Sequence, residues 1–315
     1  MSQNVPSLAF VFPGQGSQSV GMLAELAAAH AEVKSTFDEA SQGAGIDLWA
    51  LSQQGPEDQL NRTENTQPAL LAASVAVWRV WQKLGGALPA QLSGHSLGEY
   101  SALVCAGALS LLDAAALVAE RGRLMQAAVP AGVGAMAAIL GGDDALIAAV
   151  CEEIAHGQVV APANYNSPGQ LVIAGHAEAV DRALAKLAEQ GVKKAVKLPV
   201  SVPSHTALMR EAADKLGERM ASIAWQLPGI PVVQNAEARV YNTLEDIRAA
   251  LQRQLYLPVR WTECVQTLAA SGATRMAECG PGKVLAGLIK RIDKSVEARA
   301  IGTPAELDAA RGEWV

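Results

Sequence analysis

Three short apolar runs, each followed by a glycine-containing turn and then by a helical pattern, constrain the fold of this chain most strongly. The turns are, in chain order, Pro13-Gly14-Gln15-Gly16-Ser17, Gly94-His95-Ser96-Leu97-Gly98 and Gly280-Pro281-Gly282. Strand, tight turn and helix in this order form the repeating unit of α/β proteins with a mostly parallel sheet. Loops at the carboxyl ends of such strands meet at one edge of the sheet, where sites are usually built.

The periodicity of apolar residues predicts two domains. Outside residues 134–198 we expect strands at 8–12, 90–93, 231–233 and 275–279, and helices at 22–29, 67–84, 111–129, 206–223, 244–254 and 259–270, with further helices from Ser101 and Lys283. Inside them we expect strands at 135–140, 158–164, 170–174 and 192–198, and helices at 145–155 and 177–190. The inner order, β-α-β-β-α-β, is the ferredoxin-like split unit. We therefore predict a discontinuous large α/β domain, residues 1–130 and 199–315, with an inserted ferredoxin-like small domain, residues 131–198.

Composition and charge exclude several classes of protein. The chain has 315 residues, of which 50% are hydrophobic and 18% charged, as in ordinary globular proteins. A net charge of −6 argues against general nucleic-acid binding, which needs a basic surface. The first Lys or Arg is Lys34, so a secretory signal is not expected. The four cysteines show no metal-type spacing, and we expect reduced thiols in a cytoplasmic protein with no metal.

One uncharged, apolar run, Leu124 to Gly142, approaches the length of a membrane span. Pro130, Gly132 and Gly134 interrupt it. Two elements joined by a loop therefore explain this run better than a membrane helix. We expect no association with a membrane.

The turn around Ser96 has the G-x-S-x-G pattern between a strand and a helix, which is typical of a nucleophile elbow. The glycines permit the tight turn, so that the serine Oγ is exposed while the next amide and the helix N-terminus point at it. The pentapeptide alone is a weak signal, because Gly and Ser are common in turns. Ser96 is nevertheless the candidate nucleophile.

A serine nucleophile needs a general base, usually a histidine. His205 follows an apolar strand and the turn Val202-Pro203-Ser204, and it precedes a helix. It is either the base or a solvent-facing loop histidine, and we predict the base. Three of the other histidines lie at predicted helix ends, and the fourth lies in the elbow with its side chain pointing away from Ser96. These are His30, His156, His176 and His95.

The α/β-hydrolases offer the obvious alternative for G-x-S-x-G. Their triad runs in the order Ser, Asp or Glu, His, with the histidine near the end of the chain. Here 110 residues follow His205 and none of them is a histidine. The sequence therefore indicates a different arrangement around the elbow.

Arg121 lies on the apolar stripe of the predicted helix 111–129. Its neighbours three and four positions away are Leu117, Val118, Leu124 and Met125. A guanidinium on a buried face is costly unless an anion pairs with it. Two interpretations stay open, an internal salt bridge and a bidentate clamp for a substrate carboxylate. Arg123, beside Glu120, is predicted to be solvated.

Six motifs resemble, in order and spacing, those of the malonyl-CoA:acyl-carrier-protein transacylase family of type II fatty acid synthesis. They are FPGQGSQ at 12–18, GHSLGEY at 94–100, RGRLMQ at 121–126, NSPGQLVIAG at 166–175, VPSHT at 202–206 and ECGPGKVLAGL at 278–288. The resemblance implies a hydrolase-like large domain with a ferredoxin-like small one. It also implies that Ser96 is the nucleophile and His205 the base, with a backbone carbonyl near Gln254 orienting the imidazole.

The same resemblance assigns the other site residues. The backbone amides of Gln15 and Leu97 would form the oxyanion hole, and Arg121 would hold the malonyl carboxylate. The side chains of Gln15 and Gln254 would line the pocket, and Asn166 would lie at the edge of the cleft facing the small domain.

The reaction implied is a two-step acyl transfer from malonyl-CoA through a malonyl-serine to the phosphopantetheine thiol of acyl carrier protein. No cofactor is implied, and we expect a monomer. The alternatives left open are a malonyltransferase acting on a polyketide or malonate decarboxylase carrier protein, a serine thioesterase, and a non-catalytic module that binds carrier protein. Two basic clusters are candidates for the docking surface: Lys193, Lys194 and Lys197, and Lys283, Lys290, Arg291 and Lys294.

Overall fold

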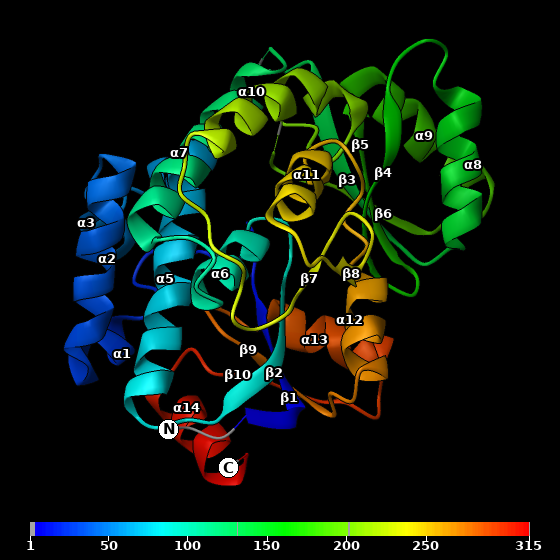
Figure 1. The fold of residues 1–315 in the computed structure, drawn as a ribbon. Helices are drawn as coiled ribbons and strands as arrows, with labels where there is room; N and C mark the ends of the chain where they lie inside the picture. Colours follow the sequence, from blue (N-terminus) through cyan, green and yellow to red (C-terminus); the bar gives the residue numbers. More distant parts are fainter. Residues whose placement is uncertain (1–3, 131, 201, 315) are drawn as a thin grey trace.

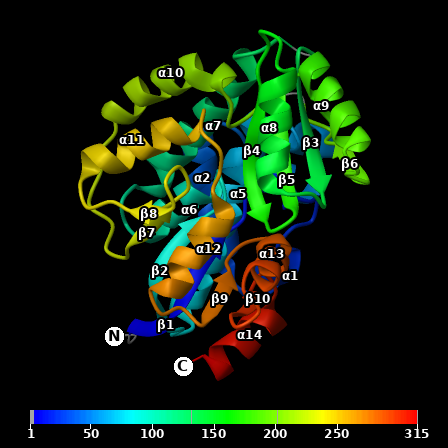
Figure 2. The ribbon, with the colours of Figure 1, turned by 90° about the vertical axis from the view of Figure 1, so that its right-hand side faces the viewer.

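Two β-sheets organise the chain, a large mostly parallel one and a smaller antiparallel one (Figures 1 and 2). The structure is a computed structural model that describes residues 4–130, 132–200 and 202–314. The predicted start of the small domain, residue 131, and the outermost residues of the predicted large domain lie outside these ranges. The mixed α/β architecture predicted from the sequence is confirmed.

The large sheet has the strand order β10-β9-β1-β2-β7-β8. Its strands are β1 (Asn4–Phe12), β2 (Leu88–Gly94), β7 (Val232–Gln234), β8 (Arg239–Val240), β9 (Arg275–Glu278) and β10 (Glu297–Ala300). All neighbouring pairs are parallel except β7 and β8. The predicted strands before the three glycine-containing turns, β1, β2 and β9, therefore lie side by side, and their turns meet at one edge.

Strand β1 is buried on both faces, and its side chains alternate between two cores. Leu8, Phe10 and Phe12 pack with the helices on one side of the sheet, while Ala9 and Val11 pack with those on the other. The first group of helices is α1 (Ala24–Ala29), α2 (Ala31–Ala44), α3 (Leu48–Gln54), α4 (Glu57–Leu60), α5 (Thr63–Lys83), α6 (Gly98–Cys105), α7 (Leu111–Ala127), α10 (Arg210–Ala221), α11 (Leu244–Gln254) and α14 (Pro304–Glu313); the second is α12 (Trp261–Ala270) and α13 (Val284–Ile292).

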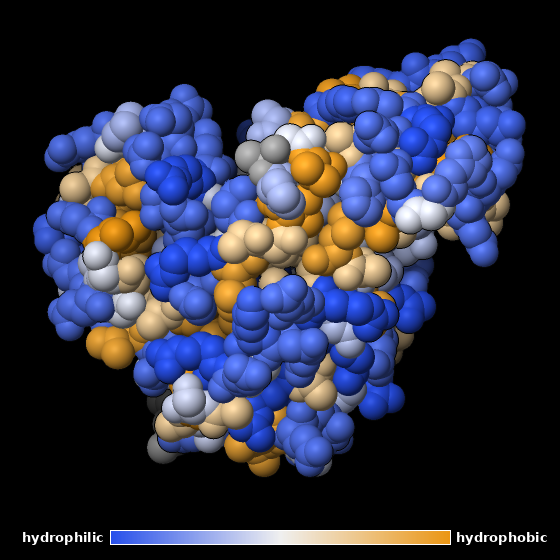
Figure 3. All heavy atoms as spheres, turned by 90° about the horizontal axis from the view of Figure 1, so that it is seen from above, coloured by the Kyte–Doolittle hydropathy of each residue, from blue (hydrophilic) through white to orange (hydrophobic). Residues whose placement is uncertain are grey.

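The small sheet has the strand order β4-β5-β3-β6, and every pair in it is antiparallel. Its elements follow the predicted order: β3 (Gly134–Leu140), α8 (Asp144–Ile154), β4 (Val160–Ser167), β5 (Gln170–His176), α9 (Ala177–Glu189) and β6 (Lys194–Lys197). Ile139, Ile147, Ile173 and Val180 share the core under its two helices. Seen from above, the end of the molecule that carries α8 and α9 is mostly polar, and apolar residues gather nearer the centre (Figure 3).

Several boundaries differ from the prediction, including the start of α5, which begins at Thr63 and not at residue 67. Strand β6 starts two residues late, because the Val192 N–H closes the end of α9 on the Leu187 carbonyl at 3.0 Å. The helix expected from Ser101 begins at Gly98, directly after the elbow. The helix expected from Thr206 begins with a 3₁₀ turn, Ala207–Met209, before α10.

The apolar run 124–142 is divided as predicted. Helix α7 ends at Ala127, and β3 starts at Gly134. Within the three described ranges, no helix has the length and apolar character needed to cross a membrane.

Candidate active site

The turn between β2 and α6 presents Ser96 as an elbow. A Cβ on Gly94 would lie 1.9 Å from the backbone carbonyl carbon of Gly98, and one on Gly98 would lie 2.0 Å from the Phe12 carbonyl oxygen. Only glycine fits both positions. Ser96 itself has a φ of 51°, in the left-handed region that costs a non-glycine residue about 1–3 kcal/mol. The predicted strand–elbow–helix geometry is therefore present.

His205 contacts Ser96 from a loop that lies 109 positions later in the sequence. Its Nε2 lies 2.9 Å from Ser96 Oγ, and its Nδ1 lies 2.6 Å from the Gln254 carbonyl oxygen. A carbonyl can only accept, so Nδ1 carries the proton and Nε2 accepts from the serine hydroxyl. Gln254 is the last residue of α11, where carbonyls lack partners within the helix. That helix end thus orients the imidazole without a carboxylate.

Burial sets the protonation state of this imidazole. His205 is 4% exposed. Burial, and then the positive charge of Arg121, lowers the pKa of His205 to about 3. The ring is therefore neutral at physiological pH, as a general base must be.

Arg121 lies deep in the site, with 1% of its surface exposed. Its guanidinium donates from Nη1 to Gln67 Oε1 at 2.8 Å and from Nη2 to Gln254 Oε1 at 3.0 Å and Ser96 Oγ at 3.2 Å. None of the ion pairs found among the described residues involves it, whereas Arg123 pairs with Glu120 at the surface. The internal salt bridge considered for Arg121 is therefore wrong; neutral amides hold the guanidinium beside the nucleophile.

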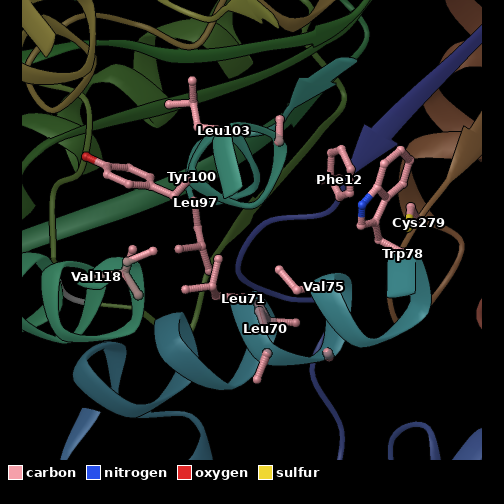
Figure 4. Packing of buried hydrophobic residues seen from close by; sticks show 14 of the residues in the cluster. Phe12, Leu70, Leu71, Val75, Trp78, Leu97, Tyr100, Leu103, Val118 and Cys279 are labelled. Atoms are coloured by element: carbon pink, nitrogen blue, oxygen red, sulfur yellow. The ribbon is translucent and has the colours of Figure 1, made fainter. Parts of the chain in front are cut away.

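The loop after β1 lies against the elbow. A Cβ on Gly14 would lie 2.6 Å from the His95 carbonyl oxygen, and Gln15, next along, is exposed. The Leu97 side chain points toward Leu70 and Leu71 of α5 in the core (Figure 4). The backbone N–H groups of Gln15 and Leu97 donate no hydrogen bond within the described part of the chain.

Asn166, on β4, connects the elbow to the small sheet. Its Oδ1 lies 2.8 Å from His95 Nε2, so the His95 ring is directed to Asn166. The His95 ring also packs against Trp261, with ring centroids 5.6 Å apart. Gln254 is fully buried, and its side-chain Nε2 donates to the Ser96 carbonyl oxygen at 2.9 Å.

Three polar residues around Ser96 were not predicted from the sequence. Gln67 holds Arg121, Asn235 accepts from the Ser96 N–H at 2.7 Å, and Glu99 accepts from Asn235 and Gln254. Burial raises the pKa of Glu99 to about 7, although the hydrogen bonds that Gln234, Asn235 and Gln254 donate to its carboxylate lower the pKa. Asn235 follows an apolar strand at the same sheet edge as Ser96, and that position was an available signal.

Metal ligation has no basis in the described ranges, where no group of three or more His, Cys, Asp or Glu side chains could hold an ion. The chemistry available is that of an activated serine, a neutral imidazole and a buried guanidinium.

The chain is similar to known proteins over most of its length. The acyl transferase domain model matches residues 9–304. The malonyl CoA-acyl carrier protein transacylase of Salmonella typhimurium is 60% identical over 302 residues, covering 96% of this chain and 98% of that protein. The crystal structure of malonyl-CoA:acyl carrier protein transacylase from Xanthomonas oryzae pv. oryzae covers 100% of both chains, with a TM-score of 0.98 and 66% identity.

A further solved structure contains a partner. It is a type II PKS acyl-carrier protein in complex with its malonyl-transacylase; the matched chain is 55% identical, has a TM-score of 0.96, and the match covers 97% of this chain and 99% of that one. With these matches spanning nearly its whole length, the chain belongs to the malonyl-CoA:acyl-carrier-protein transacylase family and is an acyltransferase.

Proposed function

We propose that this protein transfers the malonyl group of malonyl-CoA to the phosphopantetheine thiol of acyl carrier protein through a malonyl ester on Ser96. One observation carries the proposal: Ser96 Oγ is hydrogen-bonded both to a neutral imidazole and to a buried guanidinium that has no carboxylate partner among the described residues. The first group activates an alcohol, and the second suits an acyl chain that ends in a carboxylate.

In the first half-reaction, His205 Nε2 takes the proton of Ser96 as Oγ attacks the thioester carbonyl. The oxyanion that forms would be stabilised by the backbone N–H groups of Gln15 and Leu97. The partial negative charge at the end of α11 stabilises the imidazolium. The tetrahedral intermediate collapses, the carbon–sulfur bond breaks, and the imidazolium gives its proton to the departing coenzyme A thiolate.

In the second half-reaction, the thiol of phosphopantetheine attacks the malonyl-serine ester. His205 takes the thiol proton and returns it to Ser96 Oγ as the ester bond breaks. The serine is thereby regenerated, and no oxidant, metal or cofactor enters the balance.

Arg121 selects the acyl group in this proposal. A malonyl carboxylate would pair with its guanidinium, in place of the bond from Nη2 to the serine. Gln15 and Gln254 would contribute to the pocket, and Asn166 would mark the edge of the cleft toward the small domain.

The proposed architecture is a hydrolase-like large domain, residues 1–130 and 199–315, with a ferredoxin-like small domain, residues 131–198. The strand order β4-β5-β3-β6 and the β-α-β-β-α-β sequence of elements support the second assignment. We propose a cytoplasmic monomer whose partner is acyl carrier protein.

Intact-protein mass spectrometry tests the proposal. The parent enzyme incubated with malonyl-CoA should carry one malonyl group, and holo carrier protein added next should remove it and gain its mass. Ser96→Ala should lose the adduct, while Ser204→Ala, a nearby serine outside the elbow, should keep it. A malonyl adduct on Ser96→Ala would refute the assignment, and net hydrolysis without acceptor would identify a thioesterase. A panel of carrier proteins separates the fatty acid acceptor from the polyketide and malonate decarboxylase alternatives.

A further inference from the structure

We propose that Glu99 is a positioning residue that fixes both peptide groups flanking the nucleophile, acting through Asn235 and Gln254. The inference rests on the proposed function of Ser96. It concerns how the backbone of the elbow is held, and so which way the adjoining amides point.

Side chains hold both backbone polar groups of Ser96. The Ser96 N–H donates to Asn235 Oδ1 at 2.7 Å, and the Ser96 carbonyl accepts from Gln254 Nε2 at 2.9 Å as well as from the Glu99 N–H at 3.1 Å. The first contact fixes the peptide group between His95 and Ser96, and the second fixes the one between Ser96 and Leu97. Asn235 also donates from Nδ2 to the Gly94 carbonyl at 2.7 Å, which joins it to the end of β2.

Fixing the second peptide group aims an oxyanion donor. In a trans peptide the carbonyl and the N–H point in opposite directions. When the buried Gln254 holds the Ser96 carbonyl, the Leu97 N–H is directed away from Gln254. The strained φ of 51° at Ser96 persists only because its surroundings hold it.

Glu99 contacts both of the residues that do this, the backbone of Asn235 and the side chain of Gln254. Its Oε2 accepts from the Asn235 backbone N–H at 2.7 Å and from Gln254 Nε2 at 3.1 Å, and its Oε1 accepts from Gln234 Nε2 at 2.8 Å. The carboxylate is fully buried. It lies on α6, three residues after Ser96, so one residue of the elbow helix organises contacts from two distant segments.

The bonds from Asn235 and Gln254 both end on Glu99 Oε2. Position 99 therefore needs an oxygen acceptor there, but not a negative charge. A glutamine at position 99 can place its Oε1 where Glu99 Oε2 lies and keep both bonds. Its amide nitrogen would then face Gln234, whose buried Oε1 has no hydrogen-bond partner among the described residues and can turn to accept from it, with loss of the 3.2 Å bond from Gln234 Nε2 to the Ile247 carbonyl. Glu99→Gln therefore preserves the arrangement, whereas Glu99→Ala removes it.

The experiment measures malonyl-serine formation by rapid quench over a range of malonyl-CoA concentrations. Glu99→Ala should lower the saturating rate about 10²-fold, the loss expected when an oxyanion donor is displaced. The concentration giving half the maximal rate should stay within about threefold of the parent value, because the displaced amide acts on the transition state. Glu99→Gln should restore the rate to within about fivefold of the parent.

Three further variants complete the test, and Asn235→Ala keeps it decisive if Glu99→Ala folds poorly. Asn235→Ala removes the acceptor of the Ser96 N–H directly and should slow acylation to a similar degree, and the double variant should be no slower than the slower single one. Glu278→Ala is the matched control: it removes another fully buried carboxylate, which accepts from the Ala286 N–H at 2.8 Å, and it should lower the melting temperature without slowing acylation.

Three results would overturn the inference: rapid acylation by Glu99→Ala, a Glu99→Gln variant as slow as Glu99→Ala, or equal slowing by Glu278→Ala. Each requires that the parent enzyme forms malonyl-serine. If the parent forms none, the proposed function fails instead, so the two failures are distinguishable.

Discussion

Replacing Arg121 by alanine should change which acyl group is preferred. Opposite charges 4 Å apart at an effective dielectric constant of about 20 attract by about 4 kcal/mol, and desolvation of the carboxylate reduces the net gain. A net loss of about 3 kcal/mol corresponds to about a 10²-fold fall in the ratio of kcat/KM for malonyl-CoA over acetyl-CoA. The acetyl group has no carboxylate to lose a partner. Removing the cation also relieves the charge that helps to lower the pKa of His205. Acetyl transfer should therefore be kept or become faster.

The assay compares single-turnover acylation by the two thioesters for the parent, Arg121→Ala and Arg123→Ala. Arg123 is the matched control, because it lies on the same helix, half of its side chain is exposed and it pairs with Glu120. Arg123→Ala should leave the ratio unchanged. An unchanged ratio in Arg121→Ala, together with a lower melting temperature, would refute the reasoning and leave Arg121 a structural role only.

Three other predictions follow from the pKa values and the surface. Since the pKa of free-enzyme His205 is about 3, kcat/KM for malonyl-CoA should stay flat from pH 7.5 down to about pH 5 and not halve near 6.5, as an ordinary histidine would require. The pKa of Glu99 is about 7 in the folded protein, above its ordinary value of 4.5. The free energy of unfolding should therefore fall by up to about 3 kcal/mol as pH rises from about 4.5 to about 7. The melting temperature of Glu99→Gln should accordingly be higher than that of the parent at pH 8 but not at pH 5. Reversing Lys290 and Arg291 to glutamate should raise KM for an acidic carrier protein at low ionic strength; equal kinetics would place docking elsewhere.

The fold was predictable where burial imposes a clear period. Strand β1 alternates Leu8, Phe10 and Phe12 with Ala9 and Val11, and the amphipathic helices α9 and α11 were located to within one residue. The region Ala31–Leu60, which forms α2, α3 and α4, was missed because polar and small residues interrupt its apolar spacing. Strand β10 was missed because it is short and alternates Glu297 and Arg299 with two alanines at the sheet edge.

A site residue was predictable only where the neighbouring residues in the sequence indicate its chemical role. A glycine-flanked serine, a histidine before a helix and an arginine on an apolar stripe each carry their own signal. Glu99 carries none, because its role arises from contacts with segments more than a hundred positions away, and Asn235 carries only its place after an apolar strand at the same sheet edge. Gln67 was missed because it lies 54 positions before Arg121, on a different helix, and the two helices pack only in the folded protein.

The same geometry couples substrate choice to catalysis. In the free enzyme the Arg121 guanidinium is the second cause, after burial, of the low pKa of His205. A general base works best when its pKa lies near the working pH, so the uncompensated cation weakens the base. A malonyl carboxylate paired with Arg121 would offset that charge and raise the pKa of His205, which favours the imidazolium formed in the transition state. An acetyl group would leave the cation uncompensated and the base weak. Part of the malonyl preference should therefore appear in the rate of acylation at saturation and not in KM alone, because the carboxylate improves the base as well as the binding.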